Sequence, residues 1–303
     1  MSGKSRKRIL KKVLITGGNG FIARSLAREF VEKYDLTVCS RSELDLLNVN
    51  HVSEFLRHHH FDVIIHTATY DAAPKGSKKA PSMVLEYNMR MFTNLVRCEH
   101  DYGKLLYFGS GAEFSRPHWI PKMRETFFDK HVPQDQYGYS KYLMTKIAES
   151  KNNIINLRLF GVFGELDDWR YRFLSNICCH ALKKQSITVQ QNAKVDFLYI
   201  KDLIKVVQWF VDYQPQHSVY NVCSGMAYEY TELAASVAKL YSSEEIDVVI
   251  HNQQIRHEYS GDNSLLLKEI PDLKLTPIQT SLSSLLQWYQ AHQDEIDPRQ
   301  FHY

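Results

Sequence analysis

Tyr137 and Lys141 are residues whose types and spacing suggest chemistry. They lie four positions apart, so a helix over this segment places both side chains on one face. A lysine cation beside a phenol favours the phenolate, and we therefore expect Lys141 to lower the pKa of Tyr137. Such a tyrosine can exchange a proton with a carbonyl oxygen near neutral pH. The same pair also occurs in helices where it has only a structural role, so the surrounding sequence must decide whether this pair is catalytic.

Ser110 is the candidate partner of this pair. It follows the apolar run 104–108 and lies between two glycines. In an open α/β sheet the ligand lies beyond the carboxyl ends of the strands, and a serine hydroxyl there can hydrogen-bond and polarise a substrate carbonyl. Read alone, Ser110 is a turn residue. Read with Tyr137 and Lys141, it is predicted to be catalytic.

A glycine-rich loop near the start of the chain suggests a cofactor site. Small residues at positions 17, 20 and 23 match the dinucleotide pattern G-x-x-G-x-x-G/A, between an apolar run and a segment of helical spacing. Backbone N–H groups and the helix N-terminus then favour a pyrophosphate. The alternative is a purely structural turn. The predicted cofactor-binding residues of this loop are Gly17, Asn19, Gly20, Phe21 and Ile22.

Arg41 indicates which dinucleotide is bound. An acid at the end of the second predicted strand would hold the ribose hydroxyl of NAD, but the segment there reads Cys39-Ser40-Arg41-Ser42. A guanidinium suits the 2′-phosphate of NADP, so we expect NADP(H) rather than NAD(H), with an exposed surface arginine as the alternative. Asp45 and Leu46 are predicted to line the adenine. Thr67 and Ala68, directly after the third strand, complete the predicted cofactor site.

Alternating elements must position these residues. Short apolar runs typical of buried strands alternate with segments of helical spacing, which predicts βαβ units with right-handed crossovers and a parallel sheet. We expect an α/β fold with a doubly wound parallel sheet of the Rossmann type and a smaller C-terminal substrate lobe. Strands are predicted at 13–16, 36–39, 61–66, 104–108, 154–157, 187–189 and 219–222, and helices at 21–33, 51–60, 81–102, 136–151, 173–184, 230–241 and 282–292.

Three parts of the chain follow from this pattern. Residues 1–12 are a basic N-terminal tail and residues 13–164 the dinucleotide-binding domain. Residues 165–303 are mainly the substrate-binding lobe, with some segments returning to the first domain. No low-complexity linker separates the two lobes, so we expect the second to be built onto the first.

Composition excludes several classes of protein. The chain has 303 residues, 44% of them apolar and 23% charged, which is globular rather than disordered composition.

Its formal net charge of +3 depends on a basic head, and without that head the chain is slightly acidic. A nucleic-acid-binding domain should instead carry a basic face, so we expect no nucleic-acid partner. The head is interpreted as a solvated tail, with an anionic partner as the alternative. Its basic residues are Lys4, Arg6, Lys7, Arg8, Lys11 and Lys12.

The expected location follows from the cysteines and the apolar runs. Five scattered cysteines, with no C-x-x-C pair, are typical of a reduced intracellular protein. No apolar run approaches the ~20 residues of a membrane span, and no apolar signal segment follows the basic head. We expect a cytoplasmic protein with no membrane partner.

Together these motifs resemble the extended short-chain dehydrogenase/reductase family of the NAD-dependent epimerase/dehydratase type. The resemblance covers most of the chain and includes the later segments 158–164, 196–202 and 220–225. Members mostly act on nucleotide-activated sugars. The chain is most similar to 4-keto-sugar reductases such as GDP-fucose synthases and dTDP-dehydrorhamnose reductases, in which a segment like 41–47 serves NADP. The resemblance implies that Lys141 holds the nicotinamide ribose and that the protein is a homodimer through the helices around Asn88 and Tyr137. Asn88 either supports the active site, as the resemblance implies, or is an ordinary helix residue.

The sequence also departs from these relatives. GDP-fucose synthases epimerise their sugar with a cysteine two positions after the serine and a histidine on a later helix, whereas this chain has Ala112 and no histidine within 172–176. Simple reduction is therefore favoured. The usual R-D-F motif reads Val195-Asp196-Phe197, which leaves the substrate phosphate without its arginine. Candidate substrate-binding residues are Glu113, Arg170, Arg172 and Lys194, the last three also being ordinary surface charges.

The predicted function is NADPH-dependent reduction of the C4 ketone of a nucleotide-linked 4-keto-6-deoxy sugar. One alternative is a redox-neutral epimerase or dehydratase that retains NAD(P), although only Glu113 is available as a dehydratase acid near Ser110. The other is a non-catalytic NADP-binding protein. No metal is expected, because the consecutive histidines 58–60 point in different directions around a helix. The aromatic side chains of Trp169, Tyr171 and Phe173 fit sugar or base stacking and core packing equally.

Overall fold

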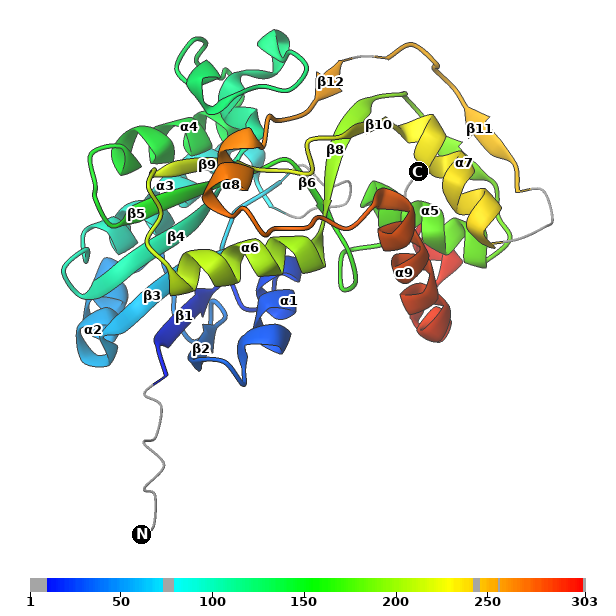
Figure 1. Cartoon of the computed structure of the whole chain (residues 1–303). Helices are drawn as coiled ribbons and strands as arrows, with labels where there is room; N and C mark the ends of the chain where they lie inside the picture. Colours follow the sequence, from blue (N-terminus) through cyan, green and yellow to red (C-terminus); the bar gives the residue numbers. More distant parts are fainter. Residues whose placement is uncertain (1–9, 73–78, 242–245, 256, 302–303) are drawn as a thin grey trace.

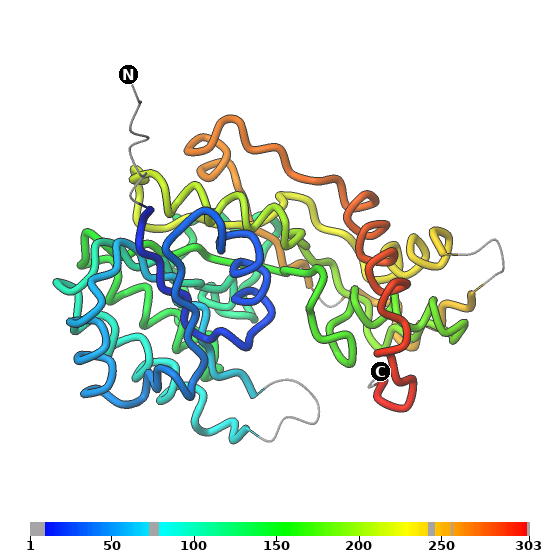
Figure 2. Tube along the Cα trace, turned by 90° about the horizontal axis from the view of Figure 1, so that it is seen from below, coloured from blue at the N-terminus to red at the C-terminus, as the bar shows by residue number. Residues whose placement is uncertain are grey.

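The computed structural model describes residues 10–72, 79–241, 246–255 and 257–301, and two lobes lie side by side in both views (Figures 1 and 2). The larger lobe holds a six-stranded parallel sheet in the order β2-β1-β3-β4-β5-β9. This confirms the predicted α/β fold with a doubly wound parallel sheet. Its strands are β1 (Lys12–Thr16), β2 (Asp35–Cys39), β3 (Phe61–His66), β4 (Tyr102–Ser110), β5 (Ile154–Leu159) and β9 (Val219–Val222).

Helices cover both faces of this sheet. The strands are apolar on both sides, as expected when both faces are buried. In β1, Val13 and Ile15 pack with α1 (Phe21–Phe30) and α6 (Ile200–Asp212), whereas Leu14 faces the opposite layer. That layer consists of α2 (Val49–His59), α3 (Val84–Val96) and α4 (Gln136–Ala148).

The strand order reverses between β1 and β3, and this reversal locates the ligand crevice. In doubly wound sheets ligands bind beyond the carboxyl ends of the strands at such a switch point. The loops that follow β1 and β3 meet there, since a Cβ atom at Gly17 would lie 2.8 Å from the backbone of Ala68. Gly17 and Ala68, two of the predicted cofactor residues, therefore meet at the carboxyl edge of the sheet, where β4 also ends at Ser110.

The smaller lobe packs α5 (Phe173–Leu182), α7 (Tyr230–Tyr241) and α9 (Ile278–Ala291) against short strands (Figure 1). Its central strand is β8 (Lys194–Tyr199), which lies between β10 (Ala227–Glu229) and β12 (Glu258–Tyr259) and also pairs with β6 (Gly161–Phe163). A second pair joins β7 (Ile187–Val189) and β11 (Val248–Ile250). One buried apolar cluster runs from α1 and α6 into α5, α7 and α9, so the two lobes share a core.

Several elements differ from the sequence-based expectation. The predicted helix 81–102 is shorter, because Pro81–Met83 forms a 3-10 turn and Tyr102 begins β4 opposite Phe61. Helix α6 and strands β6, β8, β10, β11 and β12 were not predicted. The short helix α8 (Ser264–Glu269), which lies against β9, was also missed.

The basic head is only partly described. The Lys11 ammonium donates to the carbonyl oxygens of Val211 and Asp212 at the end of α6, at 2.9 Å each. A cation is favourable at a helix C-terminus, so Lys11 caps α6 rather than extending into solvent. The basic residues at positions 4, 6, 7 and 8 lie outside the described residues. Within the described part of the chain, no helix is long and apolar enough to cross a membrane.

Candidate active site

Ser110 ends β4 and begins a one-turn 3-10 helix over Gly111–Phe114. Its Oγ accepts the N–H of Ala112 at 3.2 Å, and its own N–H donates to Glu113 Oε1 at 2.9 Å. These two bonds form a reciprocal capping box, which satisfies the free N–H groups at the start of the turn. The serine hydroxyl is therefore held in a defined position at the edge of the sheet.

The Glu113 carboxylate anchors this turn to the neighbouring strand and helix. Its carboxylate is fully buried and accepts hydrogen bonds from Arg158 Nε at 2.8 Å and Thr145 Oγ1 at 2.9 Å. The Asn156 amide lies 3.3 Å from the same carboxylate. Sequence reasoning placed Glu113 among the substrate-binding residues. The structure instead commits it to a buried ion pair, because Arg158 is also fully buried and needs a counter-charge.

Helix α4 presents Tyr137 and Lys141 on one face, as their spacing predicts. Asp135 caps the helix by accepting the N–H of Gly138 at 2.9 Å. A Cβ atom at Gly138 would lie 2.7 Å from the Ala112 carbonyl oxygen, so this glycine allows α4 to approach the Ser110 turn closely. The Lys141 ammonium lies 5.9 Å from the centre of the Tyr137 ring and donates to the Phe108 carbonyl at 2.8 Å.

The electrostatics of Tyr137 differ from the prediction. Burial, followed by the negative charge of Asp71, raises the pKa of Tyr137 to about 12, and a hydrogen bond with Ser110 opposes this rise. Burial also lowers the pKa of Lys141 to about 8. The expected lowering of the Tyr137 pKa by Lys141 is therefore wrong for this structure, since desolvation of the phenolate dominates. Tyr137 is consequently protonated near neutral pH.

The loop after β1 has the shape that a dinucleotide pyrophosphate requires. Gly17 has a φ of +70°, and a Cβ there would lie 2.8 Å from the Ala68 backbone. Gly20 precedes α1 and has no side chain to cap the N–H groups of the first helical turn, which includes Phe21 and Ile22. Amide donors at a helix N-terminus bind phosphate, so these residues fit the cofactor that the pattern predicts.

The remaining predicted cofactor residues follow β2 and β3 or lie at the tip of this loop. Arg41 is exposed over 70% of its side chain and its Nε lies 3.7 Å from Asp45 Oδ1. Leu46 is buried, and its carbonyl accepts the amide of Asn94 at 2.8 Å. Thr67 donates to the Thr16 carbonyl at 2.7 Å, which ties the ends of β1 and β3 together. Asn19 is exposed at the tip of the glycine loop.

The three cations predicted to bind substrate have different surroundings. Arg170 is held by Asp168, and Lys194 lies 3.1 Å from Glu258. Arg172 is exposed, with its Nε 3.9 Å from Asp167 Oδ1, and its positive charge counteracts the rise in the Tyr137 pKa. Arg172 is therefore the cation of this set whose charge affects the pKa of Tyr137.

Further residues support the site. Asn88, for which the sequence left two interpretations, is buried and accepts the N–H of Tyr70 at 2.7 Å, while its amide donates to the Tyr70 carbonyl at 3.1 Å and approaches Ser140 at 3.4 Å. It thus joins the loop after β3 to α4 beside Lys141. Asp71, in that loop, was not singled out from the sequence because nothing in its neighbours marks it.

Tyr259 was also missed. Its hydroxyl lies 3.4 Å from Ser110 Oγ, although 149 positions separate the two residues. Its strand has two residues, which is too short to give a periodic signal. Of the three aromatic residues that sequence reasoning left open, Trp169 and Phe173 pack against the core, and the Phe173 ring stacks on Tyr230 at 4.0 Å.

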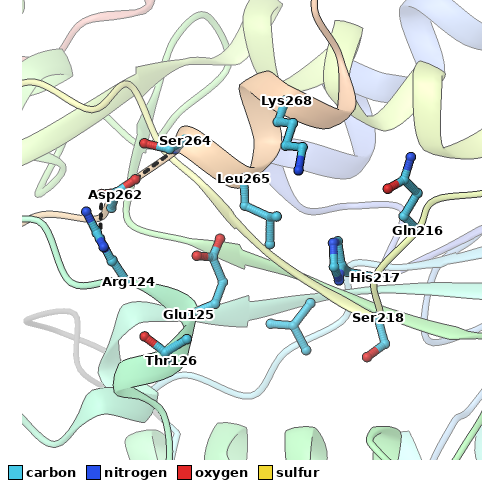
Figure 3. A pocket seen from close by; sticks show the side chains of 11 residues that line it. Arg124, Glu125, Thr126, Gln216, His217, Ser218, Asp262, Ser264, Leu265 and Lys268 are labelled. Atoms are coloured by element: carbon cyan, nitrogen blue, oxygen red, sulfur yellow. Dashed lines mark hydrogen bonds and ion pairs between the residues drawn. The ribbon is translucent and has the colours of Figure 1, made fainter.

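Other candidate sites in the described residues offer less support for a function. Among the described residues there is no group of three or more His, Cys, Asp or Glu side chains arranged to hold a metal ion, and all five cysteines are buried and unpaired with one another. A pocket of about 860 Å³ lies between residues 124–126, 216–219 and 262–268 (Figure 3). Its Arg124 pairs with Asp262 at 3.2 Å, and Glu125 accepts the N–H of Asn221 at 2.8 Å. None of the predicted site residues lines it.

Comparisons with known proteins match this fold and identify the family of the chain. A GDP-L-colitose synthase of Yersinia pseudotuberculosis is 22% identical over 92% of this chain and 97% of its own length. The structure of a UDP-glucose 4-epimerase of Thermotoga maritima matches with a TM-score of 0.80 at 14% identity, over 93% of this chain and 99% of that one. A GDP-mannoheptose C4 reductase of Campylobacter jejuni, solved with NADP bound, matches with a TM-score of 0.79 at 18% identity, over 94% of this chain and all of that one. The family model for the NAD dependent epimerase/dehydratase family matches residues 13–223, and the chain belongs to that family.

Proposed function

We propose that this chain uses NADPH to reduce the C4 ketone of a nucleotide-linked 4-keto-6-deoxy sugar. The observation that carries the proposal is the geometry of the site: Tyr137 and Lys141 share one face of α4, and α4 packs closely against the turn that begins at Ser110. Reduction of a ketone needs a proton donor at the carbonyl oxygen, and a phenol whose pKa is raised to about 12 remains protonated at the pH of turnover. The names of similar proteins, a GDP-L-colitose synthase and a GDP-mannoheptose C4 reductase, support a nucleotide sugar as the substrate class.

Each residue has a defined role in this proposal. NADPH, when bound, supplies a hydride to the carbonyl carbon. The N–H groups at the start of α1 bind the pyrophosphate, and Arg41 contacts the 2′-phosphate. Ser110 donates a hydrogen bond to the carbonyl oxygen, and Tyr137 transfers its proton to that oxygen. The Lys141 cation then stabilises the phenolate that remains and contacts the nicotinamide ribose.

Simple reduction fits the residues better than reduction with epimerisation. Epimerisation next to a ketone needs an acid and a base that exchange carbon-bound protons. The position two after Ser110 is the buried Ala112, whose side chain cannot exchange a proton. Residues 172–176 at the start of α5, where the histidine is expected, contain no histidine.

The test is NADPH oxidation, followed by its near-ultraviolet absorbance, with GDP-, dTDP-, UDP- and CDP-linked 4-keto-6-deoxy sugars. We expect rapid oxidation with one of them and loss of at least about 100-fold in kcat for Tyr137→Phe. Tyr139→Phe, which removes a hydroxyl two positions along the same helix, is the matched control and should retain activity.

Other results would identify a different function. If no sugar oxidises NADPH and the purified protein retains NAD or NADP, a redox-neutral epimerase or dehydratase is indicated. If NADPH binds reversibly but no sugar is converted, the protein binds the cofactor without catalysis. Oxidation that persists unchanged in Tyr137→Phe would refute the assignment of Tyr137 as the proton donor.

A further inference from the structure

A hydroxyl from the smaller lobe reaches the catalytic serine. Tyr259 lies in β12, which pairs with β8 through the register Tyr259 to Val195. Its hydroxyl is 3.4 Å from Ser110 Oγ. This is long for an O–H···O bond, but catalytic hydrogen bonds are often long before substrate binds and shorten in the complex.

The ring of Tyr259 is held tightly, so its hydroxyl has little freedom. It packs on Trp119 with ring centres 4.2 Å apart and on Phe160 at 5.0 Å. A Cβ atom at Gly111 would lie 2.7 Å from the Tyr259 ring, which shows how closely the ring approaches the serine turn. The following residue, Ser260, accepts the N–H of Met123 at 3.1 Å through its carbonyl oxygen and thereby fixes the strand to the larger lobe.

The hydrogen-bonding capacity of the Ser110 hydroxyl indicates which of the two hydroxyls, Ser110 or Tyr259, donates in this contact. A serine hydroxyl has one proton to donate and two lone pairs that accept. The N–H of Ala112 already occupies one lone pair at 3.2 Å. If Tyr259 occupies the second, the single Ser110 proton is directed to Tyr137 or to a substrate carbonyl oxygen. Each accepted bond also polarises the donated one.

We propose that Tyr259 is a positioning residue that donates to Ser110 and thereby commits the serine proton to the substrate carbonyl. This role rests on the proposed ketoreductase function. It requires Tyr259 to remain protonated, and burial raises its pKa above the usual range for tyrosine. It also requires the smaller lobe to be packed against the larger one, because β12, which carries Tyr259, belongs to the sheet of the smaller lobe.

Tyr259→Phe tests the proposal, because it retains the ring packing and removes only the hydroxyl. Loss of one hydrogen bond that acts in the transition state should lower kcat about 5- to 10-fold, with little change in the KM for either substrate. Tyr228→Phe is the matched control: Tyr228 lies in β10 and pairs with the same Val195 from the other side of β8. It should leave kcat within about 2-fold. An unchanged kcat in Tyr259→Phe would overturn the proposal.

A double variant separates positioning from a general structural effect. If Tyr259 acts through Ser110, then Tyr259→Phe should cause no further loss in a Ser110→Ala background. A full further 5- to 10-fold loss there, of the size expected above, would show that Tyr259 acts independently of the serine and would refute the assignment.

A third measurement needs no substrate and therefore decides the inference even if no sugar is reduced. Ser110→Cys introduces a thiol whose thiolate Tyr259 can stabilise by donation, so adding Tyr259→Phe should raise the pKa of this thiol by about 1. The readout is the ultraviolet absorbance of the thiolate, as a difference from the matching Ser110 protein. Subtracting the matching Ser110 protein removes the contribution of the five native cysteines, whose pKa values burial raises. An unchanged or lower thiol pKa would overturn the donation by Tyr259, whatever the enzyme reduces.

Discussion

The buried pair of Glu113 and Arg158 yields a prediction for the perturbation Glu113→Gln. The carboxylate oxygens accept from Arg158 Nε, from the Thr145 hydroxyl and from the Ser110 N–H, all within 2.9 Å. Glutamine has nearly the same shape but replaces one accepting oxygen by an NH2 group, which donates. Whichever way the amide is turned, at least one buried donor faces another donor, and the Arg158 charge is left without a counter-charge.

The magnitude follows from burial. Both side chains are fully buried, so water cannot replace the lost carboxylate charge. Breaking a buried ion pair by removing one partner costs about 3–5 kcal/mol of unfolding free energy. For a chain of this size, about 2 °C of melting temperature corresponds to 1 kcal/mol, so we expect a fall of about 6–10 °C.

The assay is urea unfolding followed by tryptophan fluorescence, with equal m values required for the comparison. The matched control is Glu86→Gln. Glu86 forms an exposed i,i+4 pair with Arg90 at 3.0 Å, with 45% of the Glu86 side chain accessible, and such pairs contribute about 0.3–0.5 kcal/mol. The two substitutions remove the same charge and differ mainly in burial.

Two results would refute this reasoning. The first is a loss below about 1 kcal/mol in Glu113→Gln, which would mean that Arg158 is solvated or finds another acceptor. The second comes from the double variant Glu113→Gln/Arg158→Met. Removing both charges leaves no unpaired ion, so this variant should be more stable than Glu113→Gln alone. Additive losses would show that the two side chains are not coupled.

Three further predictions concern other parts of the molecule. Arg41→Ala should weaken NADPH binding about 10-fold or more and NADH binding less than about 2-fold, measured by fluorescence titration. Equal weakening of both would refute the assignment of Arg41 to the 2′-phosphate. Gly17→Ala should destabilise the protein by about 1–3 kcal/mol in urea unfolding, because φ is +70° and the new Cβ meets the Ala68 backbone, whereas wild-type stability would contradict this steric reasoning. Burial lowers the pKa of Lys104 to about 8 from its usual 10.5, so the native state releases this proton before the unfolded state does. The stability of wild type relative to Lys104→Met should therefore rise between pH 8 and pH 10.5, and a constant or falling difference over that range would refute the assignment.

The parallel sheet could be predicted because buried parallel strands have an unusual composition. Four of the six residues in the segment 61–66 are apolar, and the structure gives a strand with these bounds. Strands buried on both faces need apolar side chains on both sides, so they appear as short continuous runs. The rule that ligands bind beyond the carboxyl ends of such strands then grouped Gly17, Ser110 and Tyr137 before any contact was known.

Helix α6 was missed although the sequence contains its signal. Ile200, Leu203, Val207 and Phe210 are buried and recur at helical spacing. Strands β10 and β12 are different. They have three and two residues, and they exist because β8 offers them partners, which no local pattern reveals.

The pKa of Tyr137 shows a second limit of sequence reasoning. The spacing of Tyr137 and Lys141 correctly predicts that they share a helix face, because helical geometry is local. The sign of the pKa shift depends on burial and on Asp71, which the loop after β3 brings near the phenol. Both are tertiary properties, and here they outweigh the cation.

The position of Ser110 changes how the two lobes should be regarded. Every residue that the sequence assigned to catalysis lies within the first 141 positions, in the predicted dinucleotide-binding domain. The structure gives the Ser110 turn contacts from both lobes. Glu113 supports it from within the larger lobe, and the Tyr259 hydroxyl approaches it from the sheet of the smaller lobe. Because β12 pairs with β8 at Val195 and the Lys194 ammonium contacts Glu258, a substrate that displaces Lys194 would act on the strand that carries Tyr259. Under the predicted role of Lys194 and the proposed role of Tyr259, substrate binding in the smaller lobe is linked to the orientation of the Ser110 proton, and substitutions in β8 should alter kcat as well as KM.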